Sequence, residues 1–167
     1  LKYNVILMIS SIKYPDHIEL NKTLYPLIKG SKKYHISEGT GKRTTFNIHK
    51  RKEIRGLVDW MKTLFPEYKI AISWGVVYNK GEGARKHSHE PYPMTFVYYV
   101  NVPEGSSPLI IEDEIINVSS GELIVFDGDK NHQVPSSTVD NRCVIAGNIA
   151  PASFLDNIFL YIRKRLL

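Results

Sequence analysis

Three histidines in the second half of the chain have residue types and spacing that suit a metal ion. His87 and His89 stand two residues apart, and alternate residues of a β-strand point to the same face. We therefore expect their imidazoles to converge on one point. His132 follows a predicted strand at Glu122–Phe126, and a sheet that brings it beside His87 gives three ligands on one face of a metal. The opposite face then stays open to substrate.

Arg142 is the second candidate functional residue. The residues after it, Cys143–Ala146, are apolar and predicted to form a buried strand. A guanidinium in such a strand is costly unless it holds an anion, and its planar fork of donors suits a carboxylate. An internal salt bridge and an exposed position at the strand end are the other two interpretations. The remaining histidines are expected on the surface or in ordinary hydrogen bonds: His17, His35 and His49.

Short segments rich in Val, Ile, Phe and Tyr follow Pro66 and would position these residues. Gly, Pro, Asn and Ser separate the segments, which predicts an antiparallel sandwich or barrel. The predicted strands are Lys69–Tyr78, Met94–Val102, Leu109–Glu112, Glu122–Phe126 and Arg142–Ile149. Trp74, inside the first of them, is expected to be a core residue.

The first helical pattern lies near the start of the chain. Asp16 followed three residues later by Glu19 resembles a capping box, and apolar residues at helical spacing follow it. Pro26 removes a hydrogen bond and clashes with the preceding turn, so we expect the helix to break and to end near Gly30. An early strand is predicted at Lys2–Ile9.

Two further helices and a loop complete the pattern. Lys50–Phe65 has apolar residues at helical spacing and is followed by Pro66, which predicts a helix. Ser31–Asn47 is polar and basic, and it is predicted to be a mobile loop of the kind that often covers a site. Residues 151–167 predict a last helix, with apolar residues on one face.

Length and composition indicate a single globular domain. The chain has 167 residues, of which 43% are hydrophobic, so disorder is excluded and no disulfide or structural metal is needed for folding. We predict a helical N-terminal layer at 1–68, a β-core at 69–150 and a C-terminal helix at 151–167. The lone Cys143 suits a reducing cytoplasm. The longest aliphatic run, Val5–Ile9, is too short for a membrane span.

The segment Trp74–Asn148 resembles the iron(II)- and 2-oxoglutarate-dependent dioxygenases. The resemblance is closest to the prolyl-hydroxylase-like branch and to short oxygenases of that type from bacteriophages and marine bacteria. His87 matches the first iron ligand of this family, and His132 matches its distal histidine. The resemblance implies an α+β fold with a double-stranded β-helix (jelly-roll or cupin-like) core.

Three further residues match family positions around the cosubstrate. Arg142 matches the arginine that pairs with the tail carboxylate of 2-oxoglutarate, and Tyr99 matches a tyrosine that hydrogen-bonds the same carboxylate. Tyr78 precedes His87 by nine positions, as a tyrosine near the cosubstrate does in the prolyl hydroxylases. The resemblance therefore implies a hydroxylase with Fe(II) as cofactor and with 2-oxoglutarate and O2 as cosubstrates.

The resemblance leaves the substrate open. A peptidyl residue is the nearest analogy, a small molecule is the other candidate, and nucleic acid is disfavoured. No membrane partner is expected. The expected compartment is the cytoplasm, which is that of the host cell if the chain comes from a phage.

One position departs from the family pattern. The H-x-D motif of the family has an aspartate where His89 stands, and a neutral ligand leaves the metal one unit more positive. His89 can be the third ligand of a three-histidine centre, Glu90 or another nearby acid can reach the metal, or the protein can be an impaired binding relic. We favour the three-histidine centre, because the spacing puts His89 on the ligand face and Glu90 on the other.

Two other function classes stand as alternatives. A cupin-type metal-binding protein has the same β-helix, but its metal-binding glutamate is missing here and Arg142 would have no task. A catalytically silent module would bind a polyanion through the basic region Lys29–Arg55, since the cations concentrate in residues 1–86 although the net charge is only +5. No zinc-binding or helix-turn-helix motif supports that alternative.

Overall fold

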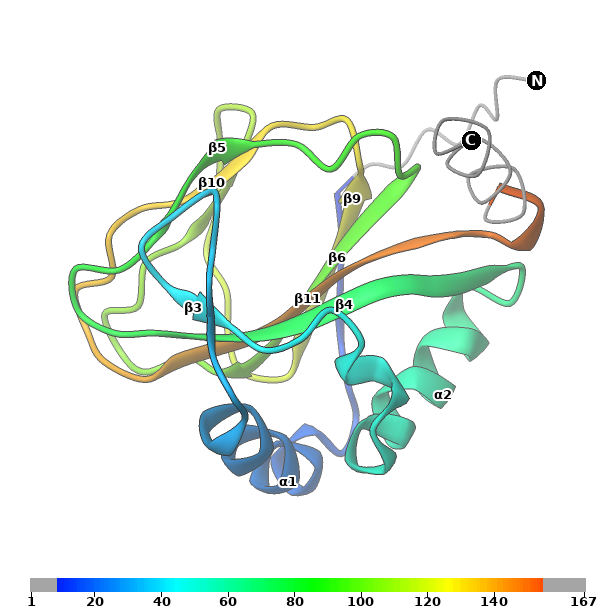
Figure 1. The fold of residues 1–167 in the computed structure, drawn as a ribbon, viewed down its shortest axis with the longest axis horizontal. Helices are drawn as coiled ribbons and strands as arrows, with labels where there is room; N and C mark the ends of the chain where they lie inside the picture. Colours follow the sequence, from blue (N-terminus) through cyan, green and yellow to red (C-terminus); the bar gives the residue numbers. More distant parts are fainter. Residues whose placement is uncertain (1–8, 155–167) are drawn as a thin grey trace, which may run out of the picture.

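Two antiparallel sheets face each other in the computed structural model, which describes residues 9–154 (Figure 1). The larger sheet has the strand order β1 (Ser10–Lys13), β9 (Glu122–Asp127), β6 (Met94–Asn101), β11 (Arg142–Pro151), β4 (Tyr68–Tyr78), β3 (Lys42–Arg43) and β2 (Tyr34–His35). The smaller sheet has the order β5 (Ala84–His87), β10 (His132–Val134), β7 (Leu109–Ile111) and β8 (Glu114–Ile116). The predicted double-stranded β-helix is confirmed.

Side chains alternate between the two faces of the central strands. On β6, Phe96 and Tyr98 pack in the core beneath the helices, whereas Val97 and Tyr99 belong to the core between the sheets. β9 and β11 alternate in the same way. The alternation of side chains along these strands therefore gives the larger sheet one face that packs against the helices and another that lines the interior of the β-helix.

Two α-helices cover the outer face of the larger sheet (Figure 1). The helical elements are α1 (His17–Gly30), the 3-10 turns η1 (Ile48–Lys50) and η2 (Lys52–Ile54), and α2 (Arg55–Leu64). The Tyr98 hydroxyl of β6 donates to Asn21 Oδ1 of α1 at 3.0 Å, which ties the first helix to the centre of the sheet. The opposite face of the sheet is thereby left to the smaller sheet and the cavity between them.

α1 runs through Pro26 without a break, so the predicted interruption is wrong. Leu24 and Ile28 lie on either side of Pro26, and both are fully buried. Burial of such a side chain contributes about 1.5–3 kcal/mol, so the two together offset the cost of about 3 kcal/mol of a proline inside a helix. Asp16 is the N-cap residue, but its side chain makes no capping hydrogen bond, so the predicted capping box does not form.

The second helix begins later than predicted. Arg51 has extended backbone and separates η1 from η2, so the regular helix starts at Arg55 and not at Lys50. Ile48 and Ile54 are buried in the core beneath the sheet. Burial of these two side chains holds the backbone in two short turns. Helical periodicity alone predicts a continuous helix over the same residues.

The polar segment 31–47, predicted as a loop, contains the two short strands β2 and β3. β3 pairs with β4, and Gly39 forms an isolated bridge with Ala84, the first residue of β5, so the β2–β3 hairpin spans both sheets. A side chain at Gly39 would collide with the Gly83 carbonyl, and one at Gly83 would lie 2.6 Å from the Val134 carbonyl oxygen. The hairpin therefore lies directly against the strand that ends in His87.

Two predicted elements lie mainly outside the described residues. These are the strand at Lys2–Ile9 and the helix at 151–167. The first described strand, β1, begins at Ser10 and pairs with β9. None of the described helices is long and apolar enough to cross a membrane.

Candidate metal and anion site

A cavity of about 220 Å³ lies inside the β-helix. Strand β11 runs along it, and its alternate residues Arg142, Val144, Ala146 and Asn148 all line the cavity. Arg142 begins the strand, and Asn148, six residues further on, contacts His89. One strand thus links a candidate anion site with a candidate metal site.

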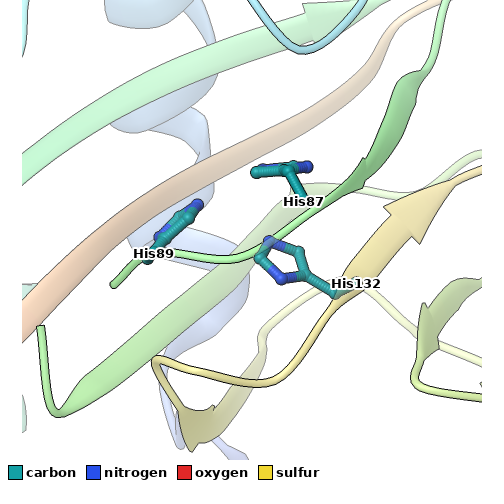
Figure 2. Close-up of side chains that lie close together, drawn as sticks. All are labelled: His87, His89 and His132. Atoms are coloured by element: carbon teal, nitrogen blue, oxygen red, sulfur yellow. The ribbon is translucent and has the colours of Figure 1, made fainter. Parts of the chain in front are cut away.

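The structure brings His87, His89 and His132 together (Figure 2). Their candidate ligand nitrogens all lie within 4.8 Å of one another. His87 is the last residue of β5 and pairs in register with His132, the first residue of β10. His89 lies beyond the end of β5, so it is not on the same strand as His87, and its backbone N–H donates to the Gly128 carbonyl at 2.7 Å.

Backbone carbonyls orient two of these imidazoles. His87 Nδ1 lies 2.7 Å from the Arg85 carbonyl oxygen, and His132 Nδ1 lies 3.2 Å from the Lys130 carbonyl oxygen. A carbonyl oxygen only accepts, so the ring proton belongs on Nδ1 in both residues. The Nε2 lone pairs are then available to a metal, which is the arrangement usual for ligating histidines.

A buried polar pair orients the third imidazole. His89 Nδ1 donates to Asn148 Oδ1 at 2.6 Å, and the Thr95 hydroxyl donates to the same oxygen at 3.1 Å. Both partners are buried, with 2% of Asn148 and none of Thr95 exposed. The sequence reasoning missed this pair. The even spacing of Asn148 from Arg142 along one strand is a signal that could have placed it on the same face.

Burial favours the neutral form of two of the imidazoles, those of His132 and His89. It lowers the pKa of His132 to about 3, with a smaller contribution from the charges of His87 and His89. Burial also lowers the pKa of His89, against the opposing effect of its hydrogen bond to Asn148. Neutral imidazole is the form that binds a metal, so His89 and His132 have no proton to expel near neutral pH.

No carboxylate joins the three histidines within the described part of the chain. Glu90 is exposed at the edge of the cavity, and Glu38 lines another part of it. Burial raises the pKa of Glu38, but hydrogen bonds from Ser37 and from its own backbone N–H, together with attraction to His87 and His89, produce a net lowering. Glu38 is therefore an ionised group near the histidines.

Arg142 is buried without a polar partner among the described residues. Only 1% of it is exposed, and none of its three guanidinium nitrogens has a hydrogen-bond acceptor there. Its guanidinium carbon lies 5.4 Å from the Tyr78 ring centroid and 5.3 Å from that of Tyr99. The two alternatives of an internal salt bridge and an exposed strand end are therefore wrong for this part of the chain.

Two tyrosines offer hydroxyl donors beside this guanidinium. Burial raises the pKa of Tyr78 to about 12 and also raises the pKa of Tyr99, in both cases against the attraction of Arg142. The Tyr99 hydroxyl is buried and has no hydrogen-bond partner among the described residues. A fixed cation and a neutral phenol with unused donors form a site that a carboxylate fits.

Trp74 packs against the core between the sheets, as predicted, and it also lines the cavity. Its ring centroid lies 5.5 Å from that of His89. The other three described histidines, His17, His35 and His49, do not join the cluster. His49, for example, contacts the Ser73 hydroxyl at 2.9 Å beneath the sheet edge.

Comparisons with known proteins bear on the fold. No protein-family model matches the chain, and no curated protein sequence matches it. Solved structures are similar to it. A viral collagen prolyl hydroxylase from Paramecium bursaria Chlorella virus-1, in complex with 2-oxoglutarate, has a TM-score of 0.67 at 12% identity, over 84% of this chain and 94% of that chain.

Two further similar structures come from other organisms. A Pseudomonas putida prolyl-4-hydroxylase has a TM-score of 0.67 at 15% identity, over 86% of this chain and 92% of that one. A Trichoplax adhaerens prolyl hydroxylase, in complex with a peptide fragment of hypoxia inducible factor, has a TM-score of 0.64 at 14% identity, over 84% and 82%. The chain has the fold of the 2-oxoglutarate oxygenases. The narrower resemblance to phage and marine bacterial enzymes stays a prediction.

Proposed function

We propose that the protein is an Fe(II)- and 2-oxoglutarate-dependent dioxygenase that hydroxylates a C–H bond of its substrate. The observation that carries the proposal is that three converging imidazoles line the same cavity as the buried guanidinium of Arg142. The fold, which is similar to that of prolyl hydroxylases, supports it.

His87, His89 and His132 would hold the iron through their Nε2 atoms. Iron(II) with 2-oxoglutarate supplies the oxidising power, since O2 and 2-oxoglutarate together yield succinate, carbon dioxide and one hydroxyl group on the substrate. The hydrogen bonds to the three Nδ1 atoms fix the rings in the ligating orientation before the metal arrives.

Arg142 and Tyr99 would bind the tail carboxylate of 2-oxoglutarate, with Tyr78 packed on the other side of the guanidinium. Formation of these hydrogen bonds satisfies buried donors that have no other described partner. Val97, Val144 and other apolar side chains line the cavity between this end and the histidines. They exclude water and so strengthen the charged contacts.

A three-histidine centre is the form of metal site that we propose. It is supported by the proximity of the His89 nitrogen to the other two and by the exposed position of Glu90. The cupin alternative is weaker, because it also requires a carboxylate ligand and gives the buried Arg142 no role. No specific contact favours a catalytically silent protein.

The test is turnover of 2-oxoglutarate by the purified protein. We expect succinate to form slowly when anaerobically Fe(II)-loaded protein is mixed with 2-oxoglutarate and O2, even without substrate. The His132→Ala variant should abolish this reaction, and His35→Ala, which changes an exposed histidine on β2, should not. No succinate from protein that demonstrably holds both Fe(II) and 2-oxoglutarate would overturn the proposal.

A further inference from the structure

A line of stacked side chains leads from solvent to the histidine cluster. Arg43 places its guanidinium carbon 3.6 Å from the Phe46 ring centroid and 5.8 Å from that of Tyr34. The Phe46 ring packs edge-on against Trp74 at 5.4 Å between centroids, and Trp74 reaches His89 at 5.5 Å. We refer to Tyr34, Arg43, Phe46 and Trp74 as the ledge.

The local fold places three ledge residues, Arg43, Phe46 and Trp74, in the lining of the cavity, and Tyr34 adjoins them through its contact with Arg43. Arg43 is on β3 opposite Val76 of β4, and both side chains line the cavity. The backbone after β3 continues along the edge of β4, where the Ser73 N–H donates to the Phe46 carbonyl at 3.0 Å. Trp74 follows directly on β4. Main-chain hydrogen bonds therefore hold the ledge beside the site, and they do so without using its side chains.

The outer rings of the ledge are exposed more than folding requires. Phe46 is 45% exposed and Tyr34 is 38% exposed. Four large hydrophobic side chains are exposed among the described residues, and these are two of them; the others, Ile18 and Ile115, lie elsewhere. Exposed apolar side chains that cluster at the rim of a cavity mark a surface that a ligand covers.

The ledge also carries positive charge without a partner. Arg43 donates one hydrogen bond, to the Thr44 carbonyl at 2.9 Å, and forms no ion pair with a described residue. Lys32 places its Nζ 5.6 Å from the Tyr34 ring centroid and is likewise free of described ion pairs. Stacking on Phe46 leaves the remaining donors of Arg43 available at the edge of the ring, where an anion fits.

The acids of the cavity do not neutralise this charge. The Glu38 carboxylate accepts a hydrogen bond from the Ser37 hydroxyl and forms no ion pair with Arg43. Glu90 directly follows His89 and is exposed. Neither carboxylate pairs with Arg43, so the guanidinium on the ledge is available to an anion of the substrate.

We propose that the ledge is the substrate-binding surface of the proposed dioxygenase and that it selects a substrate in which an anionic group adjoins a planar ring. Because the rings of Phe46 and Trp74 are nearly perpendicular, the substrate ring stacks on one of them and packs edge-on against the other, and the anion binds Arg43. This inference rests on the proposed function for the identity of the site. Carboxylate and phosphate share the required chemistry, because both accept two hydrogen bonds from a guanidinium.

Binding of small probes tests the ledge without metal or 2-oxoglutarate. The probes are phenylacetate and phenyl phosphate, with neutral phenylacetamide and ring-free acetate as references, and ligand-observed NMR gives the dissociation constants. In a Trp60→Phe background Trp74 is the only tryptophan, so its fluorescence reports where the probe binds; Trp60 itself packs against Tyr14. We expect both ring-bearing anions to bind saturably and to change this fluorescence.

Arg43→Gln should weaken both anionic probes at least tenfold and leave phenylacetamide unchanged, because only the charge-assisted hydrogen bonds are lost. Phe46→Ala should weaken all three ring-bearing probes several-fold. Matched controls are Arg55→Gln, an exposed guanidinium on α2, and Ile115→Ala, an exposed apolar residue on β8; neither should change binding. Tighter binding of phenyl phosphate assigns the anion to a phosphate, and tighter binding of phenylacetate assigns it to a carboxylate.

Two results would overturn the inference. One is binding that does not respond to Arg43→Gln or Phe46→Ala, and the other is anion binding that is lost in Arg142→Met and retained in Arg43→Gln, which would locate the probe in the inner cavity. Succinate formation without ledge binding would reject this inference alone. Ledge binding in a protein that makes no succinate would reject the proposed function alone.

Discussion

Replacing Arg142 with methionine is expected to weaken 2-oxoglutarate binding strongly and to leave folding stability nearly unchanged. In the metal-free protein three guanidinium nitrogens are buried without described acceptors, and an unsatisfied buried donor group costs about 1–3 kcal/mol. The contacts with the rings of Tyr78 and Tyr99 oppose this cost, at about 0.5–2 kcal/mol each. Methionine fills much of the same volume with an apolar chain.

These opposing contributions are of similar size. We therefore expect the free energy of unfolding of metal-free Arg142→Met to lie within about 1 kcal/mol of the wild-type value, or above it. Truncation of a large, well-packed buried side chain usually costs about 2–5 kcal/mol. Loss of two charge-assisted hydrogen bonds to the ligand costs at least about 3 kcal/mol, which corresponds to more than a hundredfold in affinity.

Two measurements check the prediction. Urea unfolding of the metal-free protein gives the stability, and calorimetric titration of 2-oxoglutarate into Mn(II)-loaded protein gives the affinity in the absence of turnover. Arg55→Met, which changes an exposed arginine on α2, is the matched control and should alter neither quantity. A stability loss above about 3 kcal/mol with unchanged affinity would show that Arg142 is a structural residue with an internal partner, and it would refute the reasoning.

Three more predictions follow from the site and the core. Asn148→Ala removes the acceptor that orients His89, so affinity for Co(II) measured by calorimetry should fall about 10- to 100-fold; an unchanged affinity would contradict the orienting role. The pKa of His132 is lower in the folded than in the unfolded protein, so metal-free protein should lose stability as pH falls from about 6.5 to about 3, by up to about 1.4 kcal/mol per pH unit; urea unfolding of His132→Gln should show a shallower slope. A Cβ at Gly75 would lie 2.8 Å from two atoms of Ile28, so Gly75→Ala should destabilise the protein by about 1–3 kcal/mol in thermal unfolding, and a more stable variant would show that α1 shifts freely.

The long strands could be predicted from sequence because their two faces are both apolar. β4, β6, β9 and β11 consist largely of Val, Ile, Phe and Tyr, and their predicted bounds agree with the structure to within about two residues. β5 and β10 could not be predicted in this way. Their sequences, Ala-Arg-Lys-His and His-Gln-Val, have no apolar alternation, and the cavity-facing residue at the end of β5 and at the start of β10 is a histidine.

Residues of the candidate site could be predicted from the sequence when their type is rare in a protein core. They could not be predicted when their type is common there. His87, His132 and Arg142 stand out in a β-rich segment, and the structure places them in one cavity. Trp74 looked like ordinary core, because an aromatic residue in a strand packs inward far more often than it lines a site. The unbroken course of α1 through Pro26 depends on burial in the tertiary structure, and the local sequence pattern carries no information about that burial.

Arg142 and Asn148 lie on one strand, so the distance between the two ends of the cavity is fixed. The length of a ligand that bridges these ends is therefore fixed as well. β11 is paired on both sides, with β4 and with β6, so it cannot slide or stretch independently of the sheet. Insertion of a single residue between these two positions would turn one of them toward the helices, since side chains alternate along a strand. If the proposed function holds, homologous chains that accept diacids of another length should differ in the side chains at this strand's two ends, and they should keep the number of residues between those ends constant.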